Sequence, residues 1–204
     1  MNASMVRFGG IALFIYLVLL ILGSLAFGGS IVGRIVGLIG TAMLIFGFWA
    51  TKGYLNAKGH SKADLPILII IGASALAAIL GLFGIGGGMG GMGGMGGMGA
   101  GGMKIAGIIA LVIMLVWFLS WLWFGFSALS FGKTGGGVWK AIGILYIIGM
   151  ACLALTVLFT ILAVAAGSAG LGVIAGILVI VGGLVLLAAV IVHGIGLIQG
   201  AGKM

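Results

Sequence analysis

The residues with the clearest potential for chemistry are four methionines that recur at every third position, Met89, Met92, Met95 and Met98, in a glycine-rich run over 86–103. Thioether sulfur is a soft ligand that favours Cu(I). In an extended helix with three residues per turn, which glycine permits, these sulfurs would form one stripe able to share a cuprous ion. Ordering so many glycines costs much backbone entropy, which favours a linker or packing element instead. Both interpretations stay open, and no other cofactor is expected.

Few other side chains are suited to catalysis. The chain has one acidic residue, Asp64, two histidines, His60 and His193, and one cysteine, Cys152. Asp64 lies just before Pro66 at the start of an apolar run, which predicts a helix N-cap rather than a proton or cation site. Without a free carboxylate, the sequence holds no set of nucleophile, base and acid. We therefore expect that the protein is not an enzyme.

A histidine and a group of tryptophans could each belong to a cofactor site, and each also has a simpler explanation. His193 lies in an apolar run and could be an axial haem ligand, but a hydrogen-bonded or snorkelling histidine is the simpler expectation. Trp117, Trp121 and Trp123 crowd one end of another apolar run. They could line a quinone or haem pocket, but tryptophan also prefers the wet boundary of a bilayer, so we expect an interfacial belt. Cys152 is expected to be an inert core residue.

The composition excludes a water-soluble globule. Of the 204 residues, 64% are hydrophobic and 5% are charged, and the mean hydropathy is +1.51. A soluble domain needs about a quarter of its residues charged to solvate its surface. Lipid must therefore be the solvent for most of this chain.

Six apolar runs are long enough to cross a bilayer. They cover roughly residues 8–28, 31–51, 65–85, 104–131, 138–166 and 171–199. Each meets the requirement of about 20 apolar residues, and runs of this length satisfy their backbone hydrogen bonds as helices. The sequence predicts an all-α integral membrane protein with six transmembrane helices. Residues 1–85 and 104–204 would form two three-helix halves, joined by the glycine- and methionine-rich segment 86–103.

The basic residues predict the orientation. With six spans, seven of the nine Lys and Arg fall on the side of the termini: Arg7, Lys52, Lys58, Lys62, Lys133, Lys140 and Lys203. Arg34 and Lys104 fall on the other side. Short loops rich in Lys and Arg stay in the cytoplasm, so both termini are expected inside and the methionine run outside the cell membrane. Attraction to anionic lipids explains these scattered charges better than nucleic-acid binding does, which we do not expect.

Small residues four positions apart line several helix faces. The pairs are Gly33 with Gly37, Ser74 with Ala78, and Gly172 with Gly176. This spacing lets two helix backbones approach closely. Close packing matters in lipid, because the hydrophobic effect does not drive helices together there. The pairs could serve packing within the chain or a surface for a partner, and the sequence does not separate these alternatives.

Two stretches resemble a known family. They are GLIGTAMLIFGFWATKGY over 37–54 and FSALSFGKTGGGVWKAIGILYIIG over 126–149. Both are similar to a group of small, mostly archaeal multispanning proteins that is catalogued as a domain of unknown function. The resemblance covers most of the chain outside the methionine run. It implies an archaeal cell membrane and a helical fold, and it supplies no activity or site residues.

These observations predict a non-catalytic integral membrane protein, either an accessory or scaffold subunit of a membrane assembly or a self-associating protein. Its expected partners are membrane lipids and other membrane subunits or itself. One alternative is a Cu(I)-handling protein that uses the outer methionines. Another is a facilitator for a small neutral solute. The polar groups available for a solute path are few: Ser120, Ser127, Thr156 and Thr160.

Overall fold

A computed structural model describes residues 2–26, 30–82 and 103–204. The long helices in these ranges are α1 (Ala3–Ala26), α2 (Ile31–Ala57), α3 (Asp64–Leu82), α4 (Met103–Gly135), α5 (Gly137–Ala166) and α6 (Ala169–Ala201), and a short 3-10 helix, η1 (Ser61–Ala63), precedes α3. Six helices in the described ranges are long and apolar enough to cross a membrane, which confirms the prediction of an all-helical chain with six helices of that length.

Local sequence explains where several helices begin and end. Ser30 precedes α2, and its hydroxyl accepts a hydrogen bond from the N–H of Gly33 at 3.0 Å, as a helix N-cap does. Gly167 ends α5 in the left-handed conformation, with φ at 60°, which glycine adopts without strain. Since Gly167 and Ser168 alone separate α5 from α6, these two helices form a tight antiparallel hairpin.

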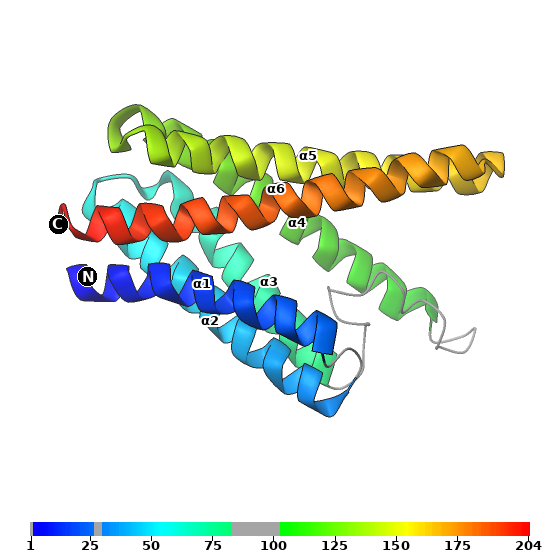
Figure 1. Cartoon of the computed structure of the whole chain (residues 1–204), viewed down its shortest axis with the longest axis horizontal. Helices are drawn as coiled ribbons and strands as arrows, with labels where there is room; N and C mark the ends of the chain where they lie inside the picture. Colours follow the sequence, from blue (N-terminus) through cyan, green and yellow to red (C-terminus); the bar gives the residue numbers. More distant parts are fainter. Residues whose placement is uncertain (1, 27–29, 83–102) are drawn as a thin grey trace.

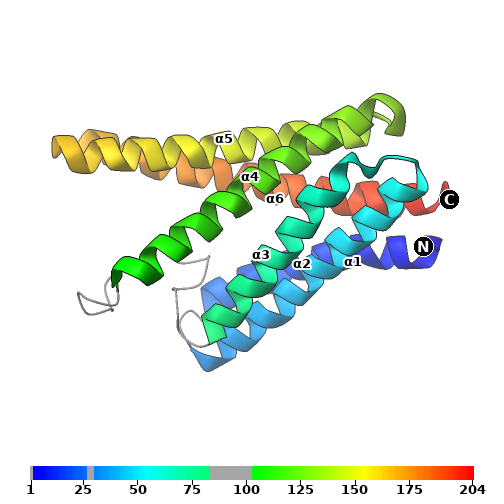
Figure 2. The same cartoon turned by 180° about the vertical axis from the view of Figure 1, so that it is seen from behind.

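The six helices form a closed ring in chain order. Each helix contacts the next one along the chain, and α1 also contacts α6, which closes the ring. Figures 1 and 2 show α1, α2 and α3 as one group, with α4, α5 and α6 packed across it. The two halves meet where α1 and α2 touch α6 and where α3 touches α4. Residues 83–102, which join the halves, lie outside the described ranges.

Glycines allow the closest helix crossings. A Cβ atom added to Gly10 of α1 would lie 2.6 Å from the carbonyl oxygen of Gly194 in α6. Between α4 and α5, a Cβ on Gly143 would lie 2.7 Å from the carbonyl oxygen of Gly125. Neither distance is possible for a real side chain without a backbone shift. The α1–α6 and α4–α5 contacts therefore depend on glycine at these positions.

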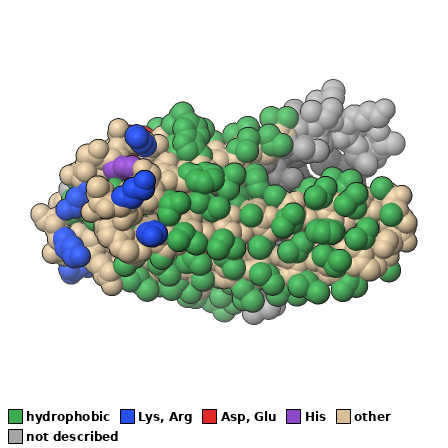
Figure 3. Space-filling view, turned by 90° about the horizontal axis from the view of Figure 1, so that it is seen from above, with side chains coloured by type: hydrophobic (Ala, Val, Ile, Leu, Met, Phe, Trp, Pro, Cys, Tyr) green, Lys and Arg blue, Asp and Glu red, His purple; other side chains and the backbone are tan. Residues whose placement is uncertain are grey.

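The tightly packed core lies toward one end of the ring, the end that carries both chain termini (Figure 1). Large aromatic side chains are buried there, among them Phe48, Phe124 and Tyr146. By contrast, the far ends of α5 and α6 are apolar and exposed: Val164 is 80% and Ile180 is 65% exposed. Figure 3 shows apolar side chains along the length of this face, with Lys and Arg gathered at the terminal end. This distribution suits a chain whose sides face lipid.

Several helices exceed the thickness of a bilayer core. The helices α4 and α6 each have 33 residues, so each is about 50 Å long at the usual rise per residue. A hydrocarbon core is about 30 Å thick, so these helices either tilt or project beyond it.

The glycine crossing predicts opposite effects at two helical glycines. Gly10→Ala should lower the free energy of unfolding by about 1–3 kcal/mol, because its methyl group forces α1 away from α6. Gly37→Ala, at a position with no atom within 4 Å of an added Cβ, should leave stability unchanged or raise it by about 0.5–1 kcal/mol. Thermal unfolding in mild detergent measures both, and equal effects would contradict the crossing.

Candidate functional site

The candidate site is a histidine that is fully buried among the helices of the ring. His193 of α6 is 0% exposed, and it lies between Thr51 of α2 and Tyr146 of α5, which are also buried. An ionisable residue inside a transmembrane bundle is costly to bury, so it marks a functional site by default. The first question is therefore what its two ring nitrogens bind.

Both ring nitrogens of His193 have hydrogen-bond partners. Nε2 lies 2.9 Å from the hydroxyl of Thr51, and Nδ1 lies 3.2 Å from the hydroxyl of Tyr146. The Thr51 hydroxyl also lies 2.8 Å from the carbonyl oxygen of Gly47, one turn back on its own helix, and donates to it. These groups form a single chain of hydrogen bonds that joins three helices.

The donors in this chain determine the histidine tautomer. Because the Thr51 proton goes to the Gly47 carbonyl, the threonine oxygen must accept the proton of Nε2. Nδ1 then carries a lone pair and accepts the proton of the Tyr146 hydroxyl. With this assignment every donor has an acceptor, whereas the opposite tautomer would leave the Tyr146 proton without one. The network is complete and ends at a backbone carbonyl.

Aromatic rings enclose the histidine. Phe48 and Trp139 meet the imidazole at steep angles, with ring centroids at 5.3 and 5.7 Å, and Phe124 stacks on it at 5.5 Å. Phe48 also contacts Trp121 of α4 edge-on at 5.1 Å. Since Phe48 and Thr51 belong to the first half and the other residues to the second, this centre joins the two halves.

The arrangement leaves the imidazole no open side for a metal or a haem. Both nitrogens are engaged, rings cover the faces, and the described ranges contain no group of three or more His, Cys, Asp or Glu able to hold a metal ion. The arrangement can hold helices together. Hydrogen bonds are strong in a low-dielectric interior, and a fully satisfied network of them favours one relative placement of the helices that carry it.

The residues considered for a solute path make hydrogen bonds close to their own positions in the chain. The hydroxyls of Ser120, Thr156 and Thr160 each donate to a carbonyl one turn back on the same helix, at 2.7–2.9 Å. Ser127 is buried, and its carbonyl oxygen is 3.2 Å from Nε2 of His60, which ties the α2–α3 connection to α4. The alternative of a solute path therefore stays a prediction.

Asp64 begins α3 as expected, but its side chain does not cap the helix. Its backbone is already helical, with φ −60° and ψ −50°. One carboxylate oxygen lies 3.6 Å from Nζ of Lys52 and accepts a hydrogen bond from the amide of Asn56 at 3.1 Å. The other oxygen has no partner in the described chain. The 3-10 turn before Asp64 carries the residue into the helix and aims the carboxylate back at α2.

The predicted small-residue pairs have different environments. Ser74 is buried and Ala78 half-buried, so this pair packs within the chain. Gly37, Gly172 and Gly176 lie on the outside, where an added Cβ would meet no atom within 4 Å in the part of the chain that the structure describes. Gly33 is half-buried near the start of α2. The methionines Met89, Met92, Met95 and Met98 lie outside the described residues.

Sequence reasoning missed the glycines that form the crossings, and it treated His193 as one isolated residue. The available signal was that Gly194 follows the histidine directly and that Gly196 and Gly200 continue one face of α6. A face of small residues beside a polar one indicates the side on which other helices approach. Nothing local in the sequence identifies Thr51 and Tyr146 as its partners.

No protein-family model, curated protein or solved structure matches the chain. The resemblance to the archaeal family therefore stays a prediction.

The hydrogen-bond chain predicts a stability cost at Thr51. Thr51→Val removes the acceptor of the Nε2 proton and leaves a buried donor unpaired, so unfolding free energy should fall by about 1–3 kcal/mol. Thr160→Val is the matched control, because that hydroxyl bonds only to its own helix, and it should change stability by less than about 0.5 kcal/mol. Thermal unfolding in detergent compares them, and a Thr51 variant as stable as the control would contradict the network.

Proposed function

We propose that the protein is a non-catalytic subunit of the cell membrane that works by helix–helix association, and that its first partner is a second copy of itself. The observation that carries this proposal is a stripe of three open glycines on α6: Gly172, Gly176 and Gly183. An added Cβ at any of them would meet no atom of the described residues within 4 Å.

The spacing of these glycines supports one continuous docking face. Gly172 and Gly176 are four residues apart and Gly183 follows seven later, so all three share one side of α6. Exposed Val173 and Ile180 flank the stripe. In lipid, apolar exposure alone does not drive association, but small residues let two helix backbones approach and gain packing contacts. Glycines that pack against no described residue of their own chain are therefore suited to another helix.

A second copy fits this face because the geometry is self-complementary. Two copies in one membrane place their α6 helices side by side and parallel, so the glycine stripe of one faces the same stripe of the other. Such an isologous contact closes into a dimer with a two-fold axis along the membrane normal. The end of the α5–α6 hairpin that is distant from the termini extends past α1 and α2 (Figure 1). This position supports a dimer through α6, because α1 and α2 do not cover the hairpin there.

Orientation is part of the proposal. Both termini lie at one end of the ring, and Lys and Arg gather at that end (Figures 1 and 3). The excess of basic residues in short connections supports a cytoplasmic location for this end.

The glycine stripe predicts a specific loss of dimer. Gly176→Leu should remove dimers seen by native mass spectrometry of mildly extracted protein, since a bulky side chain separates the two helices, while thermal stability of the monomer stays unchanged. Gly72→Leu is the matched control, because Gly72 is exposed on α3 with no atom within 4 Å of its added Cβ.

Two results would contradict this proposal. One is an unmodified protein that remains monomeric after gentle extraction and in reconstituted vesicles. The other is a Gly176→Leu variant whose dimer fraction equals that of the Gly72→Leu control.

The orientation has its own test. A small tag fused after Met204 should react with an impermeant label only after the cells are permeabilised, because the positive end stays in the cytoplasm. Labelling of the tag in intact cells would reverse the assignment.

A further inference from the structure

Two tryptophans of α4 pack inside the helix ring. Trp121 is 6% exposed, and Trp117, one turn before it, is half-buried. Their rings meet at a centroid distance of 5.4 Å. By contrast, Trp123 is 47% exposed on the outside of the same helix, where a tryptophan can belong to an interfacial belt. Trp117 and Trp121 therefore need a different explanation.

The indole N–H groups of this pair lack an acceptor. Both Nε1 atoms are buried, and neither has a hydrogen-bond partner in the described ranges. An aromatic face is only a weak acceptor for such a group. A phenylalanine would fill the same place without an unpaired donor. Two buried indoles side by side therefore indicate an acceptor that another molecule supplies.

The surroundings of Trp121 suit a carbonyl oxygen better than a water molecule. Its ring contacts Phe48 and Tyr146, each at a centroid distance of 5.1 Å, and the Tyr146 hydroxyl is already bonded to His193. A buried water needs two to four polar partners, including acceptors for its own protons. A carbonyl oxygen has two lone pairs and no proton, so it can accept from both indoles and leaves no donor of its own unpaired.

The acceptor that suits this place is also neutral and soluble in hydrocarbon. No Lys or Arg lies on α4 between Trp117 and Lys133, and an anion is costly to bury without a counter-charge. Trp121 precedes Lys133 by 12 residues, which is about 18 Å along the helix. With Lys133 at the boundary, Trp121 lies near the middle of a hydrocarbon core about 30 Å thick, whereas the ester carbonyls of lipids lie at its boundaries.

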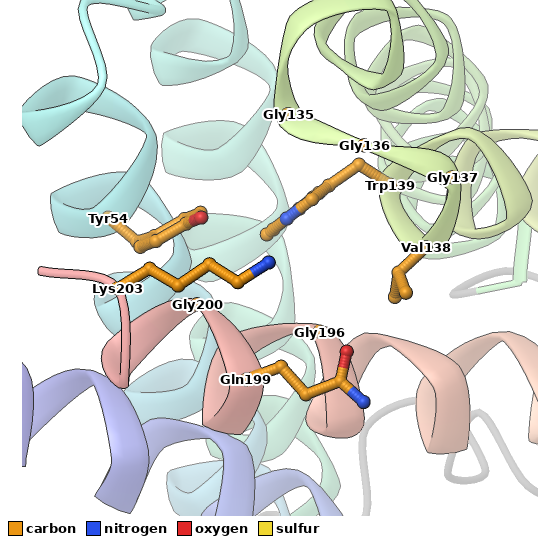
Figure 4. Close-up of a pocket in the computed structure, with 10 residues that line it drawn as sticks. All are labelled: Tyr54, Gly135, Gly136, Gly137, Val138, Trp139, Gly196, Gln199, Gly200 and Lys203. Carbon is orange, nitrogen blue, oxygen red and sulfur yellow. The ribbon is translucent and has the colours of Figure 1, made fainter.

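A pocket beside the termini does not lead to this pair. The pocket has a volume of about 110 Å³, and Tyr54, Trp139 and Lys203 are among the residues that line it, as Figure 4 shows. Tyr54 and Trp139 stack at an interplanar angle of 10°, and Trp139 also contacts His193. Neither His193 nor Trp121 lines the pocket. We therefore expect a ligand of the tryptophans to arrive through the bilayer.

We propose that Trp117 and Trp121 form a binding site for a neutral, lipophilic carbonyl compound of the quinone type, whose carbonyl oxygen accepts hydrogen bonds from both indole N–H groups. Half-buried Trp117 is the part of the site that a molecule from the bilayer meets first. The site lies on the inner side of α4. It is separate from the glycine stripe on α6 and does not rest on the proposed dimer.

The test compares two ligands of the same shape. Duroquinone is a quinone ring with four methyl groups, and durene is the matching tetramethylbenzene without carbonyl oxygens. Each is titrated into the purified protein in a neutral detergent, and the rise in unfolding temperature reports the affinity. Duroquinone should bind more tightly by about tenfold or more, since durene leaves both N–H groups unpaired. This comparison uses the unmodified protein, so it does not depend on how a variant folds.

Substitutions then test the two indoles. Trp117→Phe and Trp121→Phe each remove one hydrogen bond to the carbonyl, so each should weaken duroquinone binding by about fivefold and leave durene binding unchanged. Trp123→Phe is the matched control, because it makes the same change on the outer face of α4. It should leave both affinities unchanged.

Three results would overturn the proposal. The first is an unfolding temperature that duroquinone does not raise. The second is an equal affinity of the unmodified protein for duroquinone and durene, which would show that the carbonyl oxygens make no hydrogen bond. The third is a loss of duroquinone binding in Trp123→Phe as large as in Trp121→Phe, which would place the ligand on the outer surface of the helix.

Discussion

The rest of the structure depends on one interaction: a histidine buried inside the helix ring is paired at both ring nitrogens by groups of the chain, because an ionisable side chain is costly to bury without partners. The chain from Tyr146 through His193 and Thr51 to the Gly47 carbonyl meets this requirement across three helices. An apolar surface can pack in many registers, but a buried imidazole is satisfied in few. The histidine centre therefore selects one way of placing the first half of the ring against the second, and the surrounding aromatic rings fill the space around it.

Glycine has two distinct uses in this fold. Where two helices cross, as at Gly10 and Gly194, it removes the side chains that would hold the backbones apart. On the outer face of α6, Gly172 and Gly176 leave the backbone uncovered by any residue that the structure describes. Sequence spacing is the same in both situations, because helical periodicity says which residues share a face and not what that face meets. The inward glycines stabilise the ring, and the outward ones support the proposed contact between copies.

Much of the fold could be predicted from the sequence. Six apolar runs are long enough to cross a bilayer, and a helix is the structure in which such a run satisfies its own backbone hydrogen bonds. The six long helices of the described chain therefore follow from length and hydropathy. The pairing of helices could not be predicted, because apolar faces of similar composition do not specify partners. Asp64 illustrates the same limit: its position at a helix start was correct, but the carboxylate turns to Lys52 and Asn56, which only folding places beside it.

The sequence alone determined the number of long apolar helices and which end of the molecule carries most Lys and Arg (Figure 3), since these depend on composition and on charges counted along the chain. Only the tertiary structure decided which residues form sites. Thr51 and His193 are 142 positions apart, and Tyr54 and Lys203 lie in different halves of the chain, yet each pair meets in one place. Hydrogen bonding and packing act over a few ångströms in space, so closing the ring between α1 and α6 brings these residues together and creates both the histidine centre and the pocket beside the termini.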